Sequence, residues 1–303
     1  MRGFLLPAPL LKWKGRQFPQ GFAMGMHTRR LAASIVAGLG LTAAAEPPAS
    51  DAAGLQRKYA DLRERLERSP FGRPLHLDSR EKDGMLRGDV HALVRHAFPR
   101  VRDSLGEARQ WCEVLTLPFN VQKCETRGDA ISVHIGRKPD SPIEEATRLH
   151  LRFSVLERRD DLLRVQLVAP TGPAGTHDYR IVFEAVPIAA GGTFVHLGYG
   201  YGHGALSRLA IRTYLMTSGA DKVGFSVEGR DAEGNPRLIG GMRGILERNT
   251  MRYFLAVDAF LDALDAPEPS RRRARLEKWF AAVDRYPRQL REMSLERYLA
   301  LKE

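Results

Sequence analysis

Period-two alternation of apolar and polar residues is the feature that most constrains how this chain can fold. The alternating segments are residues 120–125, 131–135, 149–155, 163–167, 179–185 and 195–201. Successive side chains of a β-strand point to opposite faces, so this alternation is typical of strands that bury one face. Turn-forming residues separate the segments, and short connections of this kind predict an antiparallel meander of about six strands.

A long apolar stripe follows the strands. From Met242 to Leu264 apolar residues recur with a helical period. This predicts a helix of about 23 residues, and its broad apolar face needs a large apolar surface to cover it. We expect this helix to lie across the sheet. Two further helices are expected after it, over residues 270–286 and 287–300.

A helix and a hairpin are expected ahead of the strands. Apolar residues spaced by three and four predict a helix over residues 54–68, and alternation predicts a hairpin over residues 75–90. A helical period then begins at Val90 and is interrupted at Pro99. We therefore expect two short helices between Val90 and Leu115.

The N-terminal region carries the pattern of a cleavable export signal. Arg29 and Arg30 precede an almost uncharged run that is too short to span a bilayer as a permanent helix. Small residues near Ala45 suit a signal peptidase, so we expect cleavage between Ala45 and Glu46 and a periplasmic or secreted location. A membrane anchor or a buried helix is the alternative interpretation.

The exported chain would be only moderately basic. The sequence has 303 residues and a formal net charge of +11, and residues 1–45 contain six basic and no acidic residues, so the charge without them is +5. Basic residues are not interleaved with stacking aromatics, and we expect no nucleic-acid partner. A run of arginines could be either a solvated helix face or a contact with anionic lipid headgroups. It consists of Arg271, Arg272, Arg273 and Arg275.

Cys112 and Cys124 are the only cysteines. In an oxidising compartment this even pair indicates a disulfide, because its spacing lacks the close ligands of zinc motifs; free buried thiols are the alternative. Five histidines along the strands have no i, i+2 or i, i+4 spacing and are expected to be ordinary sheet residues. They are His134, His150, His177, His196 and His203. We expect no metal and no cofactor, and no segment matches a catalytic or phosphate-binding motif.

The order of elements resembles the helix-grip fold of the START-like superfamily, which includes Bet v 1-like proteins, polyketide cyclases and lipid-transfer START domains. The resemblance covers residues 71–264 and lies in topology rather than in a sequence motif. It implies an α+β fold in which a long C-terminal helix grips a curved antiparallel sheet around a cavity for a hydrophobic ligand. We expect residues 1–45 to be an extension and signal peptide, 46–70 an N-terminal helix and linker, 71–266 the START-like domain, and 267–303 a C-terminal helical extension.

Candidate cavity residues lie on the strands and on the long helix. They are Phe153, Arg152, Tyr179, Arg180, Phe183, Glu184, Tyr199, Tyr201, Phe254 and Val257. Arg180 and Glu184 fall on one face of a single strand. On the concave face they would form a buried ion pair for a polar group of the ligand, whereas on the outer face they would be solvent charges. Glycines alternate with Tyr199 and Tyr201, which leaves one side of that strand bare for close packing or for a ligand.

These expectations favour an exported protein that binds or transports a hydrophobic small molecule, such as a lipid or a polyketide-like compound. Burial of apolar ligand surface would supply most of the affinity. Two alternatives remain open. One is a cyclase or aromatase-type enzyme that uses polar residues of the same cavity. The other is a non-catalytic envelope interaction protein with a filled core.

Overall fold

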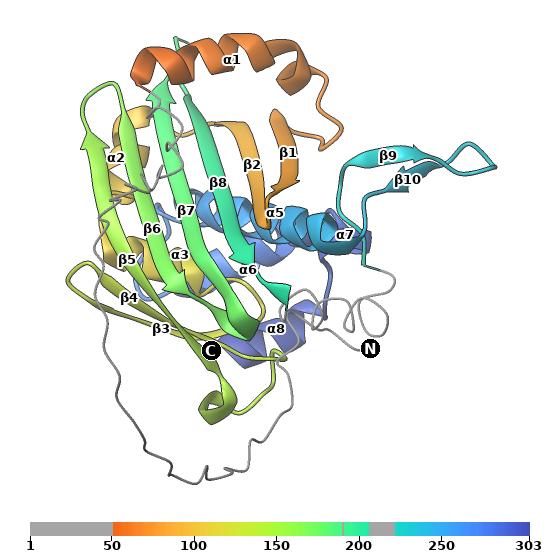
Figure 1. Ribbon diagram of the computed structural model, residues 1–303. Helices are drawn as coiled ribbons and strands as arrows, with labels where there is room; N and C mark the ends of the chain where they lie inside the picture. The colour runs from red at the N-terminus through yellow and green to blue at the C-terminus, as the bar shows by residue number, and fades with distance from the viewer. Residues whose placement is uncertain (1–50, 190, 206–221) are drawn as a thin grey trace, which may run out of the picture. The chain divides into compact units, whose positions relative to one another are not determined.

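The centre of the structure is an eight-stranded antiparallel sheet (Figure 1), seen in a computed structural model that describes residues 51–189, 191–205 and 222–303. The strand order is β1-β2-β8-β7-β6-β5-β4-β3. The strands are β1 (Leu75–Lys82), β2 (Met85–Val94), β3 (Val121–Arg127), β4 (Ala130–Ile135), β5 (Thr147–Arg158), β6 (Leu163–Thr171), β7 (Thr176–Pro187) and β8 (Thr193–His203). The expected signal peptide lies outside the described residues.

The helices stand before, within and after the run of strands. They are α1 (Ala52–Glu67), α2 (Phe98–Ser104), α3 (Ala108–Leu115), α5 (Gly241–Asp262), α6 (Arg271–Asp284), α7 (Pro287–Leu290) and α8 (Leu295–Lys302), with short 3-10 turns at Ile143–Glu145 and Pro173–Gly175. A separate hairpin, β9 (Val227–Arg230) with β10 (Pro236–Leu238), precedes α5. This architecture confirms the predicted α+β fold class, an antiparallel sheet with a long C-terminal helix across it.

One face of the sheet is covered by α5. The helix packs against β1, β2 and β8, and it also contacts α3 and α6. A glycine allows the closest approach, because a Cβ on Gly88 of β2 would lie 2.4 Å from Oγ1 of Thr250 on α5. Apolar residues of every second strand position, including Val90 and Leu197, join this core. We refer to this face as the concave face.

The other face of the sheet is covered at one end by α1. Leu55, Leu62 and Leu66 of this helix pack with Val186 and Phe194 in a second apolar cluster. Asp51 caps the helix by accepting a hydrogen bond from the backbone N–H of Gly54. The central strands are therefore buried on both faces where α1 and α5 overlap them.

The predicted disulfide is confirmed, since Cys112 of α3 is bonded to Cys124 of β3. The C-terminal helix is anchored nearby through Lys302, whose Nζ donates to the carbonyl oxygens of Thr116, Pro118 and Val121. The segment after α3 is thus fixed by the disulfide at Cys124 and by the hydrogen bonds from the buried ammonium group of Lys302.

Two predicted boundaries are wrong. The helical period expected from Val90 is a continuation of β2, which pairs with β8 as far as Val94, and the helix begins only at Phe98. The single helix expected over residues 287–300 is two short helices, α7 and α8.

The arginine run of α6 makes ion pairs and hydrogen bonds within the protein. Arg271 forms an ion pair with Glu268. Arg273 forms ion pairs with Glu277 and Glu303. Arg275 pairs with Glu113, and Arg272 donates to the carbonyl oxygen of Lys302. None of the helices in the described ranges combines the length and the apolar character that a membrane span needs.

Candidate functional site

Four tyrosines form a cluster on the concave face. Tyr179 comes from β7, Tyr199 and Tyr201 from β8, and Tyr253 from α5. The rings of Tyr179 and Tyr201 are stacked with centroids 5.1 Å apart, and the ring of Tyr199 lies 5.7 Å from Tyr201 and 5.0 Å from Tyr253. Strand alternation turns the three strand residues to one face, as predicted for Tyr199 and Tyr201. Tyr253 was not among the cavity candidates.

Most of the hydroxyl groups in this cluster have no hydrogen-bond partner among the residues that the structure describes. Tyr179 exchanges a hydrogen bond with Oγ1 of Thr176, at 2.8 Å. Among the described residues, none forms a hydrogen bond with the hydroxyl of Tyr199, Tyr201 or Tyr253. Each phenol can donate one proton and accept at its oxygen. The cluster therefore holds three phenol groups that are not engaged by the described residues, two of them buried and that of Tyr253 partly buried.

Burial keeps these phenols protonated. It raises the pKa of Tyr179 to about 12, although the hydrogen bond with Thr176 acts in the opposite direction. Burial also raises the pKa of Tyr199, Tyr201 and Tyr253, and the neighbouring tyrosines add to the effect. The cluster can donate hydrogen bonds, and it is a poor source of phenolate for base catalysis.

The apolar cavity candidates are packed in the core on the same side. Phe153, Phe183, Phe254 and Val257 are all buried in the main apolar cluster. Phe183 contacts the ring of Trp111 edge-on, with centroids 5.7 Å apart. These four side chains belong to the same apolar core as Tyr179, Tyr199 and Tyr201.

The charged cavity candidates lie on the opposite face. Arg152 and Arg180 are exposed there, because they alternate with inward-facing Phe153 and Tyr179. Glu184 shares this outer face but is buried, which differs from the solvent-exposed charge expected for that arrangement. Glu184 forms an ion pair with Arg164 of β6, at 3.0 Å. Because Arg180 and Glu184 both lie on the outer face, the concave-face arrangement considered from the sequence is wrong.

A buried polar chain on the outer face escaped the sequence analysis. His196 of β8 contacts Glu184 through Nδ1 at 2.7 Å and Asp89 of β2 through Nε2 at 2.8 Å. Burial alone would lower the pKa of His196, but the two carboxylates outweigh it and raise the pKa to about 8. The imidazolium form is thus balanced by a carboxylate on each side. Asp89 carried no signal in the sequence, because only the cross-strand register brings it to His196.

His91 stacks on this chain and remains neutral. Its ring lies 4.5 Å from that of His196, and burial together with the charge of His196 lowers the pKa of His91 to about 2. The described residues contain no group of three or more His, Cys, Asp or Glu side chains that could hold a metal ion. The histidine–carboxylate chain therefore has the character of a structural ion-pair network under α1.

The glycines of β8 serve close packing, one of the two roles expected for them. A Cβ on Gly202 would lie 2.3 Å from the ring of His177, and one on Gly200 would lie 2.6 Å from the carbonyl oxygen of Leu86. Their bare side faces away from the tyrosines. Neighbouring strands occupy that space, so the glycines allow β8 to pack tightly while Tyr199 and Tyr201 project to the concave face.

Comparison with known proteins finds similarity in solved structures only. No protein-family model and no curated protein matches the chain. It is similar to norcoclaurine synthase from Thalictrum flavum, with 12% identity, a TM-score of 0.31, and coverage of 46% of this chain and 83% of that chain. A conserved protein from Geobacillus kaustophilus shows 12% identity, a TM-score of 0.35, and coverage of 58% and 95%.

A protein from Arthrobacter aurescens gives comparable values, with 16% identity, a TM-score of 0.33, and coverage of 63% of this chain and 95% of that chain. Similarity at this level supports no statement about activity or ligand. The helix-grip architecture of this chain is established by its own strand order and by the position of α5 on the concave face.

Proposed function

We propose that this is an exported protein that binds a hydrophobic small molecule carrying oxygen acceptors, such as a lipid or a polyketide-like compound, at the tyrosine cluster. The proposal is carried by three phenol hydroxyls in an apolar region, those of Tyr199, Tyr201 and Tyr253, which have no hydrogen-bond partner within the described part of the chain. Carbonyl or hydroxyl oxygens of a ligand would accept their protons, and the surrounding rings would cover its apolar surface.

The energetics favour an occupied site. Each phenol that donates to a ligand oxygen would add a hydrogen bond worth about 0.5–1.5 kcal/mol net. Apolar ligand surface adds roughly 25 cal/mol per Å² removed from water. Together these terms favour ligands that are mostly apolar and carry a few oxygen atoms.

Conservative substitutions test this proposal. Replacement of Tyr199, Tyr201 and Tyr253 by Phe keeps the rings and removes the hydroxyls. Binding of Nile red, an apolar dye with a carbonyl oxygen, should weaken by about tenfold, whereas the melting temperature should stay the same or rise. Tyr59→Phe is the matched control, because Tyr59 lies on the other face against Phe194.

Two results would contradict the proposal. One is equal Nile red affinity in the wild type and the triple variant. The other is no dye binding by the wild type, which would favour the envelope interaction protein with a filled core. Native mass spectrometry of the protein purified from the cells that make it supplies a second readout, in which the wild type should carry a small apolar adduct that the triple variant loses.

Non-covalent binding fits the geometry better than the enzymatic alternative. A cyclase or aromatase needs polar groups that position and polarise an enolisable chain inside the cavity. Arg152, Arg180 and Glu184, which were candidates for that role, lie on the opposite face. Tyr179 and Tyr201 remain on the concave face, and their raised pKa values suit hydrogen-bond donation rather than proton abstraction.

A further inference from the structure

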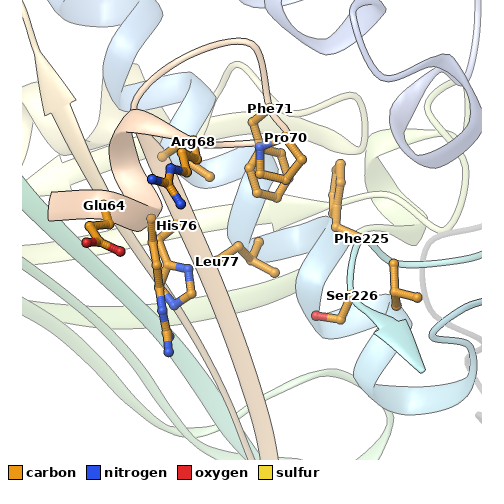
Figure 2. Close-up of a pocket in the computed structure, with 11 residues that line it drawn as sticks. Glu64, Arg68, Pro70, Phe71, His76, Leu77, Phe225 and Ser226 are labelled. Atoms are coloured by element: carbon orange, nitrogen blue, oxygen red, sulfur yellow. The ribbon is translucent and has the colours of Figure 1, made fainter. Parts of the chain in front are cut away.

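A groove lies along the free edge of β1, away from the tyrosine cluster (Figure 2). Its volume is about 450 Å³, within the range of small-molecule sites. Residues of the last turn of α1 form one side, and residues 225–227 form the other. Leu75 and Leu77 of β1 contribute apolar side chains between them. No candidate residue from the sequence analysis lines this groove.

The apolar wall of the groove is held by an aromatic cluster. The rings of Phe71 and Phe225 lie 5.6 Å apart, and Tyr286 lies 6.2 Å from Phe71 and 5.5 Å from Phe225. The hydroxyl of Tyr286 donates to the carbonyl oxygen of Phe71, at 2.9 Å. This wall is therefore pre-formed and need not be assembled when a ligand binds.

A buried carboxylate fixes the same wall to the core. Glu247 of α5 accepts from the backbone N–H groups of Phe225 and Ser226, at 2.7 and 2.9 Å. It also accepts from the hydroxyls of Ser226 and of Ser79 on β1, at 2.7 and 2.6 Å. One side chain thus ties the groove wall, the edge strand and the long helix together.

The rim of the groove carries two arginines and one glutamate, Glu64, and so has a net positive charge. Arg65 on α1 and Arg68, which caps the end of that helix, are exposed and line the groove, and among the described residues no carboxylate lies within 4 Å of either guanidinium. Arg63 on the same helix is instead paired with Glu67 at 3.2 Å. Burial and the charge of Arg65 lower the pKa of His76, which also lines the groove, so this histidine stays neutral near pH 7.

An exposed apolar residue completes the groove opposite the arginines. Val227 is 59% exposed, the highest value among the large apolar side chains in the described part of the chain. The groove thus combines an apolar wall with a cationic rim. A molecule that matches both has an anionic head and an apolar body.

We infer that this groove binds a single-chain anionic amphiphile of the fatty-acid type, with its carboxylate at Arg65 and Arg68 and its chain against Phe71, Phe225 and Val227. The site is independent of the tyrosine cluster. A carboxylate can accept from both guanidinium groups, because residues three apart on a helix lie on the same side.

A fluorescent fatty acid tests the inference on the full-length protein. The probe is 11-(dansylamino)undecanoic acid, and its methyl ester serves as the uncharged comparison. The double change Arg65→Ser and Arg68→Ser should weaken binding of the acid by about tenfold, and Arg63→Ser should leave it within about twofold of the wild type. The methyl ester should bind the wild type about as weakly as the acid binds the double variant.

Val227→Asp provides a second test, since it adds a negative charge beside the apolar wall at an exposed position. It should also weaken binding of the acid. Higher salt should weaken binding of the acid more than binding of the ester.

Equal affinities of the wild type for acid and ester, or unchanged binding in the double variant, would overturn the inference. So would the absence of any binding of the acid. Loss of acid binding in the Tyr199, Tyr201 and Tyr253 variants, with the groove variants unaffected, would place the acid on the concave face. That outcome would overturn this inference and leave the proposed function standing.

Discussion

At the scale of single residues, His196 makes stability depend on pH. Its pKa in the folded protein is about 8, above the value of about 6.5 for an unfolded chain. A raised folded-state pKa gives stability that is fully present below about pH 6.5 and is lost as the pH rises through 8. The difference corresponds to about 2 kcal/mol of unfolding free energy.

We therefore expect the wild type to lose about 2 kcal/mol between pH 6 and pH 9 relative to His196→Gln, as measured by urea unfolding. The variant should be less stable at pH 6, because Asp89 and Glu184 then lack their cation. His150→Gln, at an exposed position of the same sheet, is the control. An NMR titration that gives His196 a pKa below 7 would contradict this explanation.

The sequence predicted which strand residues share a face of the sheet, but it did not predict which of the two faces is the concave one. Alternation correctly grouped Tyr199 with Tyr201, and it separated Tyr179 from Arg180. It could not show that Glu184 is buried on the outer face, because that depends on His196 opposite it in the β7–β8 register and on the cover provided by α1. Burial of a charged residue is a property of its partners, and these come from distant parts of the chain.

At the scale of elements, Lys302 anchors α8. Burial lowers the pKa of its ammonium group to about 7, but three carbonyl oxygens around Nζ favour the charged form. Lys302→Met should lower the unfolding free energy by about 1–3 kcal/mol, since it leaves buried carbonyls without a donor. Lys278→Met, at an exposed position of α6, should change the unfolding free energy by less than about 0.5 kcal/mol. Equal effects of the two changes in urea unfolding would rule out an anchoring role.

The sequence misassigned the end of β2, a strand that, like β8, is buried on both faces. Residues 88–92 of β2 are all buried, because α5 covers one side and α1 with its neighbouring loops covers part of the other. Asp89 and His91 still alternate with apolar residues, but Ala92, Leu93 and Val94 are all apolar, and such a run resembles a helix. The strands β5 to β8 keep enough polar positions to be identified by period alone.

At the scale of the whole molecule, the disulfide is consistent with export, because disulfides persist in oxidising compartments such as the periplasm. If the chain is exported as expected, protein recovered from the periplasm of a bacterial host should begin at Glu46. Unreduced, unfolded protein should show no free thiol on labelling, because Cys112 and Cys124 are bonded. Replacing both cysteines by Ala should cost about 3 kcal/mol of stability for a loop of this length. A recovered chain that still carries the residues ahead of Glu46, or two labelled thiols per chain, would contradict the prediction.

The pairing of β2 with β8 sets an order of events for the folding chain. Val90 lies opposite Leu197 in this ladder, so the β1–β2 hairpin forms early from local contacts but lacks its neighbouring strand until about one hundred further residues are available. During that interval its apolar side chains, such as Leu86, face solvent along an unpaired strand edge. A nascent chain interrupted before β8 is therefore a template for aggregation, and holdase chaperones that bind extended apolar segments should act on this protein mainly in that interval.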